Sequence, residues 1–371
     1  MKNNLKGITL MSFFASTLLS TQLFGANIEQ LAQDVELLKA NLESNSKSGF
    51  QLAGYAAFDY SDKDFSGVKF APIFHAKYGD IFQFEGELEF NVDSKGETVT
   101  ELEYAAGTIF LNDYMGLQVG KFMSPVGQFV QNQHPSWINK LPATPVGFGH
   151  DGAAPTSNVG VALRGGLPKM GDIRSNYVLF VANASVYGKV EDGAIEGSID
   201  ANGRTSSNGA APTIGGRYAI NPVGNMEVGI SGSFGQISDV DQSSSTRDYS
   251  VFDVDFMYNI DAISLKGEYV QQDIGTSDIS SFDTEGGTWA AWYAQASYLF
   301  AFAPIEPVIR YSDYHNPELQ RNQLALGLNY LFASNLVAKL AFEVNTNEDS
   351  AVPSDGLYNE DILRMQLAFG F

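Results

Sequence analysis

The stretch Ile362-Leu363-Arg364-Met365-Gln366-Leu367-Ala368-Phe369-Gly370-Phe371 ends the chain with apolar residues at every second position from Leu363 onwards. In a β-strand, alternate side chains point to opposite faces, so this segment has one apolar face. Such a strand either packs that face on a soluble core or turns it towards lipid in a closed barrel. The same alternation recurs through most of the chain with almost no competing helix. We therefore predict an all-β transmembrane barrel, closed by the last strand against the first.

Composition fits this class and excludes several others. Glycine (37), phenylalanine (26) and tyrosine (17) are plentiful, as in strands with tight turns and aromatic girdles. Cysteine is absent, which excludes disulfides and thiolate metal sites. The net charge of −21 argues against nucleic-acid partners and favours cations. No stretch of about 18 apolar residues follows the N-terminus, so helical membrane spans are not expected.

The N-terminus has the pattern of a secretory signal peptide over residues 1–26. Lys2 and Lys6 precede an apolar run, and Gly25-Ala26 offers small residues for cleavage. The alternative is an uncleaved anchor helix. Cleavage would remove two lysines and change the net charge from −21 to −23.

Residues 27–48 hold one convincing helix and a polar linker. The helix has heptad spacing, with its seam at Ile28, Leu31, Val35, Leu38 and Leu42. Two heptads are marginal alone, which suggests a short periplasmic coiled coil in an oligomer such as a homotrimer. The equally weighted alternative is a helix that packs on its own barrel or frays.

From residue 49 to 371 the sequence predicts a 16-stranded antiparallel barrel, with fourteen and eighteen strands as the neighbouring counts. The expected strands are 50–60, 67–78, 80–91, 99–111, 114–122, 157–164, 175–186, 211–221, 224–235, 248–260, 262–273, 288–300, 304–314, 319–331, 335–345 and 361–371. The connections between them alternate between short turns and longer loops, as in outer-membrane barrels. The exceptions are 165–174, which is too long for a turn, and 315–318, which is short for a loop.

Charged residues in the strands share the phase opposite to the apolar residues, as expected for the inside of a wide barrel. The expected pore-lining residues are Lys69, His75, Lys77, Glu85, Glu87, Glu89, Glu101, Glu103, Glu227, Asp253, Asp255, Lys266, Glu268, Arg310, Lys339, Glu343 and Arg364. Each one alone could simply wet the pore or pair with a neighbour. Together they set the electrostatic potential of the pore.

The longest connection, 123–156, is rich in proline and aromatic residues. A loop this long and this apolar is not expected to extend into water. Folding inward would bury Trp137 and Phe148 and narrow the lumen, with Lys140, His150 and Asp151 at the constriction. The alternative is a loop that packs outside against a neighbouring protomer.

A resemblance to a known family arises around this loop. The segments Val119–Gly127, Pro142-Ala143 and Val159–Leu163 resemble those of the phosphate-selective porin O/P type. The resemblance implies a sixteen-stranded, usually trimeric outer-membrane channel with an inward third loop, and related proteins carry an N-terminal coiled coil. Lys121 matches a basic position of the family and is expected to belong to the constriction loop. The ladders of arginine and lysine found in phosphate-selective members are missing here. The terminal strand ending in Phe371 also resembles the signal read by the barrel-assembly machinery.

These observations favour a passive outer-membrane porin for ions and small hydrophilic solutes, leaning to cations, with no cofactor. One alternative is an anion- or phosphate-type porin, supported by Lys69, Lys77, Lys266, Arg310 and Lys339. Another is a structural or adhesive surface barrel with partner-binding loops. An enzyme is not expected, because the four histidines show no convincing catalytic pairing.

Overall fold

The computed structural model describes residues 48–149, 152–191, 194–240, 245–277, 284–347 and 361–371. The expected signal peptide and the seam of the expected coiled coil lie outside these ranges. One compact unit spans Phe50–Phe371. Within the described ranges, no helix is long and apolar enough to cross a membrane.

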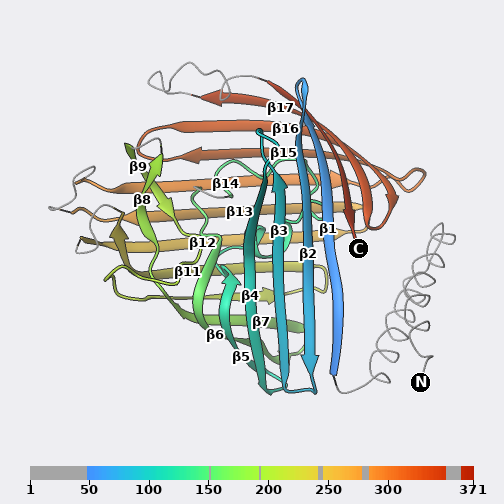
Figure 1. The fold of residues 1–371 in the computed structure, drawn as a ribbon. Coiled ribbons are helices and arrows are strands. Elements are labelled where there is room, and N and C mark those ends of the chain that lie inside the picture. The colour runs from blue at the N-terminus through green and yellow to red at the C-terminus, as the bar shows by residue number, and fades with distance from the viewer. Residues whose placement is uncertain (1–47, 150–151, 192–193, 241–244, 278–283, 348–360) are drawn as a thin grey trace, which may run out of the picture. The chain divides into compact units, whose positions relative to one another are not determined.

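The described residues form eighteen β-strands, of which sixteen close into one antiparallel barrel (Figure 1). The strands are β1 (Ser48–Ser61), β2 (Asp64–Tyr78), β3 (Phe82–Val92), β4 (Thr98–Asn112), β5 (Met115–Met123), β6 (Ser157–Met170), β7 (Ile173–Ala182), β8 (Val186–Glu191), β9 (Ala194–Asp200), β10 (Thr213–Asn221), β11 (Met226–Asp239), β12 (Thr246–Ile260), β13 (Ile263–Ile274), β14 (Gly287–Tyr298), β15 (Ile305–His315), β16 (Gln320–Ala333), β17 (Leu336–Asn347) and β18 (Ile362–Gly370). Neighbours in the barrel follow chain order, except that β7 pairs directly with β10. This architecture confirms the predicted fold class.

The terminal strand closes the barrel, as its alternation predicts. β18 pairs antiparallel with β1, from Tyr55 opposite Gly370 to Ser61 opposite Arg364. The backbone amides of Gly54 and Phe371 donate to each other's carbonyl oxygens at 2.9 Å. A closed ladder leaves no unpaired edge, which a barrel in lipid requires.

The two faces of the barrel wall differ sharply in chemistry. On β12, Phe252 and Val254 are exposed, whereas Asp253 and Asp255 between them are buried. The same alternation on the other strands gives an exposed apolar outer face and a polar inner face, as in transmembrane barrels. In Figure 1, β1–β4 run along one wall and β11–β14 cross the opposite wall.

Two of the expected connections were wrong. The predicted connection 165–174 is mostly strand, because β6 continues to Met170 and Gly171 takes a positive φ of 65° in a tight turn. The glycines and proline of this segment had indicated a loop. The predicted loop 187–210 contains a β-hairpin, β8–β9, whose first strand pairs in parallel with β11 at Ser238 and Asp239.

Candidate channel interior

The long connection between β5 and β6 lies against the inner face of the barrel. Its first part is held through its backbone: the Gly127 amide donates to Ser231 Oγ at 2.9 Å, and the Phe129 amide donates to Glu268 Oε2 at 2.8 Å. Gly127 has a φ of +77°, and a Cβ there would lie 2.0 Å from Glu268 Oε1. A residue with a side chain is therefore excluded by both conformation and space.

Aromatic packing fixes the middle of this loop. The loop side chains Phe129 and Phe148 are buried and meet edge to face, with ring centroids 5.9 Å apart. Both rings contact Tyr293 of β14 at 5.8 and 5.1 Å. A short π-helix, η1 (Phe129–Gln133), begins at this contact. The loop thus carries a small hydrophobic core to the barrel wall, where aromatic pairs add stability beyond the area they bury.

The far part of the loop is held by charged side chains of the wall. Arg310 of β15 donates to the carbonyl oxygens of Ala143 and Thr144 at 3.0–3.1 Å. Lys339 of β17 donates to the carbonyl oxygens of Ser136 and Asn139. These donors satisfy loop carbonyls that would otherwise be buried without partners.

Lys140 reaches in the opposite direction, from the loop to the wall. Its ammonium group forms an ion pair with Glu306 and donates to Ser297 Oγ at 2.9 Å. Asn329 donates to the Lys140 carbonyl oxygen at 2.9 Å. Trp137 lies directly over Gly370 of β18 and stays 38% exposed, so the expectation that inward folding buries it is wrong.

These contacts correct part of the predicted pore lining. Six of the predicted residues on β12–β17 share the inner face but are almost fully buried at 0–4% exposure: Asp253, Asp255, Glu268, Arg310, Lys339 and Glu343. Their side chains hold the loop or pair with wall residues instead of facing open space. Lys266 is half-buried, and Arg364 keeps 30% of its side chain exposed while it pairs with Glu343 at 2.9 Å.

A buried arginine that sequence reasoning missed lies beside the loop. Arg217 of β10 donates to both oxygens of Asp255 at 2.6 and 3.0 Å and to Glu227 at 2.9 Å. Its inward phase was readable from the alternation in β10. Its two acidic partners come from β11 and β12, and neither pairing was readable from one sequence.

The wall formed by β1–β4 carries both partly exposed and buried charged residues. Lys69 pairs with Glu89 at 2.7 Å, and His75 contacts Glu85 at 3.1 Å. The predicted residue Lys77 is exposed and pairs with Asp80 in the adjacent turn at 3.3 Å. Glu87, Glu89 and Glu103 lie on this wall and are buried.

Lys121 does not belong to the constriction loop. It lies within β5, on the same face as the exposed Val119, and its ammonium group donates to the Leu102 carbonyl oxygen at 2.7 Å. This face is the outer one, so the expected place of Lys121 was wrong. His150 and Asp151, also expected at the constriction, lie outside the described residues.

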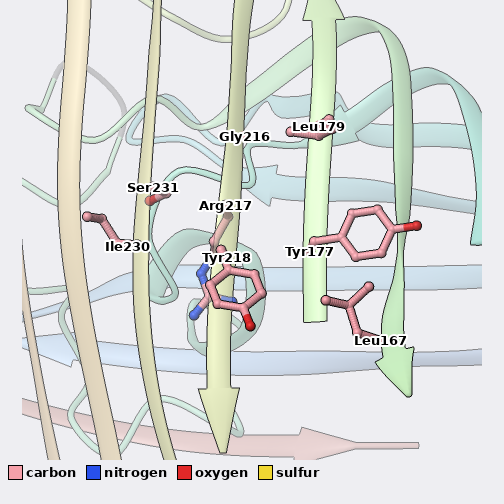
Figure 2. A pocket seen from close by; sticks show the side chains of 8 residues that line it. All are labelled: Leu167, Tyr177, Leu179, Gly216, Arg217, Tyr218, Ile230 and Ser231. Atoms are coloured by element: carbon pink, nitrogen blue, oxygen red, sulfur yellow. The ribbon is translucent and has the colours of Figure 1, made fainter. Parts of the chain in front are cut away.

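Two hollows border the Arg217 region. A polar hollow of about 300 Å³ lies between the loop residues Gln131 and Asn132 and the inward residues Arg164, Asn176 and Glu227. A groove of about 470 Å³ involves the outer face instead, lined largely by apolar residues (Figure 2): Leu167, Tyr177, Leu179, Gly216, Arg217, Tyr218, Ile230 and Ser231. The missing side chain of Gly216 leaves room between Leu179 of β7 and Tyr218 of β10. The polar hollow belongs to the interior, and the groove belongs to the exposed apolar face.

Comparison with solved structures identifies the architecture. The chain is similar to an anion-selective porin from Comamonas acidovorans, with a TM-score of 0.58 and 14% identity over 87% of this chain and 100% of that chain. It is also similar to OmpF of Salmonella typhi in complex with daunomycin, with a TM-score of 0.59 and 12% identity over 88% of this chain and 98% of that chain. The fold is that of a porin. A third structure with the porin fold, the outer membrane channel DcaP of Acinetobacter baumannii, matches with a TM-score of 0.57 and 9% identity over 88% of this chain and 98% of that chain.

Sequence comparison adds a narrower similarity to the porin fold. A family model for the β-barrel domain of the S-layer protein SlpA matches residues 184–347, which is less than half of the chain. No curated protein sequence matches the chain. The resemblance to the phosphate-selective O/P type is not tested by these matches and stays a prediction.

Proposed function

We propose that this protein is an outer-membrane porin that lets ions and small hydrophilic solutes diffuse passively, with a preference for cations. The observation that carries the proposal is that the long loop covers the inner face of some strands of the barrel and leaves that of others uncovered. The loop contacts inner-face residues of β11–β18, and we therefore place the passage beside β1–β4. The selectivity of a pore depends on the charges that border its passage, and charges buried behind a loop contribute less.

Acidic groups outnumber basic groups on the β1–β4 side. The inner face of these strands carries six carboxylates against Lys69, Lys77 and His75. Asp59, Glu85 and Glu101 keep some exposure, whereas Glu87, Glu89 and Glu103 are buried. Two basic residues that favoured an anion channel, Arg310 of β15 and Lys339 of β17, donate to loop carbonyls instead. The balance therefore supports cation preference.

The test is single-channel recording of the refolded protein in a planar bilayer, with the reversal potential measured in a potassium chloride gradient. We expect discrete conductance steps and a reversal potential of the sign set by potassium. A reversal potential of the chloride sign would contradict the cation preference and restore the anion-type interpretation. That interpretation has some support, because one similar structure is an anion-selective porin.

A surface barrel with structural or adhesive function is the second candidate. It is favoured by the match of residues 184–347 to the barrel domain of an S-layer protein. The region includes the β8–β9 hairpin and the strands up to β17. Absence of any conductance from protein that shows a folded barrel by circular dichroism would favour this function over the channel.

We further propose that the protein works as a homotrimer joined by the helix of residues 27–44, and that its last residue, Phe371, addresses it to the barrel-assembly machinery. One similar structure is the trimer form of OmpT from Vibrio cholerae, with a TM-score of 0.52 and 10% identity. Native mass spectrometry in mild detergent, with and without residues 27–44, tests the trimer. A monomer in both proteins would contradict it.

A further inference from the structure

Two buried carboxylates on neighbouring strands hold the first part of the long loop. Asp253 of β12 and Glu268 of β13 lie on the inner face and are 0% and 4% exposed. Ser231 Oγ accepts a hydrogen bond from the Gly127 amide and donates to Asp253 Oδ1 at 3.2 Å. The Phe129 amide donates to Glu268 Oε2. One oxygen of each carboxylate therefore holds the loop, either directly or through Ser231.

The other oxygens of the two carboxylates come together at the backbone of Gly127. A Cβ added to Gly127 would lie 2.0 Å from Glu268 Oε1 and 3.0 Å from Asp253 Oδ2, so these two oxygens are at most 5.0 Å apart. Apart from each other, they have no hydrogen-bond partner among the described residues. Ionised carboxylate oxygens only accept hydrogen bonds, so these two can bond to each other only through a proton.

The surroundings of the pair do not neutralise two negative charges. The charged and titratable groups on the elements packed against it are Arg217 of β10, Glu227 of β11, Asp255 of β12, Tyr293 of β14 and Arg310 of β15. Arg217 is paired with Asp255 and Glu227, and Arg310 donates to loop carbonyls. In the part of the chain that the structure describes, neither Asp253 nor Glu268 forms an ion pair. Two ionised carboxylates this close and this deeply buried would repel each other strongly.

We propose that Asp253 and Glu268 share one proton, and that the loop stays on the wall only while the pair keeps this proton. The shared proton replaces the repulsion with an O–H···O hydrogen bond, as in other buried carboxyl pairs. The outer oxygens of the pair remain free to accept from Ser231 and Phe129.

The sign of the pH effect follows from this arrangement. At acidic and neutral pH the pair holds its proton and the loop is seated. At alkaline pH the proton passes to water, two negative charges remain beneath Gly127, and their repulsion breaks the contacts at Gly127 and Phe129. The passage should therefore widen as the pH rises. The widening rests on the proposed channel function, whereas the shared proton and the seating of the loop do not.

Amide variants can replace the shared proton while keeping the shape of the side chains. Glu268→Gln puts an amide N–H in the place of the proton, and its remaining oxygen can still accept from the Phe129 amide. Asp253→Asn does the same from the other strand. Glu343→Gln is the control, because Glu343 is also buried, at 0% exposure, but pairs with Arg364 at 2.9 Å. Far-ultraviolet circular dichroism verifies that each variant forms the barrel.

Infrared spectroscopy of the full-length, detergent-folded protein tests the shared proton directly. We expect the difference spectrum between the wild type and Glu268→Gln at neutral pH to contain the carbonyl stretch of a protonated carboxyl group. This band should disappear at alkaline pH. Trypsin cleavage after Lys140, compared between proteins at the same alkaline pH, reports release of the loop. It should be faster in the wild type and in Glu343→Gln than in either amide variant of the pair.

Single-channel conductance over the same pH range tests the consequence for the passage. We expect it to rise with pH in the wild type and in Glu343→Gln and to stay constant in Glu268→Gln and Asp253→Asn. The proposal is overturned if the carboxyl band is missing from the difference spectrum, if the amide variants are cleaved as fast as the wild type, or if Glu343→Gln is protected as they are. A folded barrel without conductance would contradict the channel function alone, because the band and the cleavage do not depend on it.

Discussion

Two regions of the barrel wall, β11–β18 and β1–β4, carry similar residues in similar strands but use them differently. On β11–β18, inward charges such as Arg310 and Lys339 are buried and bind the backbone of the long loop. On β1–β4, inward charges such as Lys69 and Glu85 stay partly exposed and pair with neighbours on the same wall. Strand phase alone places both sets inside. The loop in front of them separates charges that hold structure from charges that face the passage.

The comparison teaches that the net charge of a barrel interior is a poor guide to its selectivity. Nine of the charged residues predicted to line the pore are buried, six of them on β12–β17 and three, Glu87, Glu89 and Glu103, on β3 and β4. The electrostatic potential that an ion in the pore feels from a buried charge is small when that charge is paired. A partly exposed carboxylate acts on the ion directly.

The largest effect is expected from Gly127→Val. The new side chain would clash with Glu268 and would force a β-branched residue into positive φ. Strain costs about 1–3 kcal/mol and overpacking about 1–3 kcal/mol, so seating of the loop should weaken by about 2–6 kcal/mol. We expect higher single-channel conductance and faster proteolysis within the loop.

Gly96→Val is the matched control, because Gly96 also has positive φ, at +81°, but a Cβ added there would meet no atom within 4 Å. The control should keep wild-type conductance. Unchanged conductance in Gly127→Val would contradict the anchoring role of this contact.

A smaller effect is expected from Arg310→Met. The substitution leaves the carbonyl oxygens of Ala143 and Thr144 without their charged donor. A buried group left without a partner costs about 1–3 kcal/mol. Thermal unfolding should shift to lower temperature and the open-channel current should become noisier. Arg164→Met is the control, since Arg164 makes a long 3.4 Å bond to Gln118, and it should change neither property strongly.

The next effect is on selectivity and is specific to the β1–β4 wall. Glu85→Gln should lower the cation-to-anion permeability ratio, because a unit charge about 6 Å from an ion in water contributes about 0.7 kcal/mol, or up to about threefold. Glu343→Gln removes a charge of the same kind from β17, where the side chain is 0% exposed. Reversal potentials should separate the two variants. An equal shift in both would mean that the walls do not differ in the way proposed.

The smallest effect is expected from Lys77→Met. Lys77 and Asp80 form an ion pair whose side chains are 56% and 99% exposed. Exposed pairs contribute little because water screens them. The thermal midpoint should remain within error of the wild type, in contrast to Arg310→Met. A clear loss of stability would show that exposed and buried charges of this barrel are not as different as their environments indicate.

The fold was largely predictable from the sequence, because strand alternation and connection lengths follow directly from the physics of lipid and hydrogen bonding. The terminal strand and its closure on β1 came from the alternation of five residues. The same reasoning failed at Gly165 and Gly166, which were assigned to a loop but lie in β6, because a single sequence does not distinguish a glycine in a strand from one in a loop. The β8–β9 hairpin was missed because its residues read as loop composition.

The interior was predictable in phase but not in partnership. Alternation placed Arg310, Lys339 and Asp255 on the inner face. It could not show that loop carbonyls would meet the first two, or that Arg217 would meet the third. Those partners are tens to hundreds of positions away in the sequence. Every residue has a backbone carbonyl, so residue type does not indicate which carbonyls accept these bonds. The apolar residues of the loop indicated that it packs against other parts of the protein, but they did not indicate which surface it packs against.

The contacts that hold the loop against the wall also set an order of events during folding of the barrel. Lys339 holds Ser136 across 203 positions of sequence, and Asn329 holds Lys140 across 189. Contacts of such separation form late, since the intervening chain must first be ordered. The side chains of Phe129 and Phe148 therefore stay exposed until the later strands of the barrel have formed and can cover them. During that interval the two exposed rings form an apolar surface that periplasmic chaperones would bind and through which unfolded chains would aggregate.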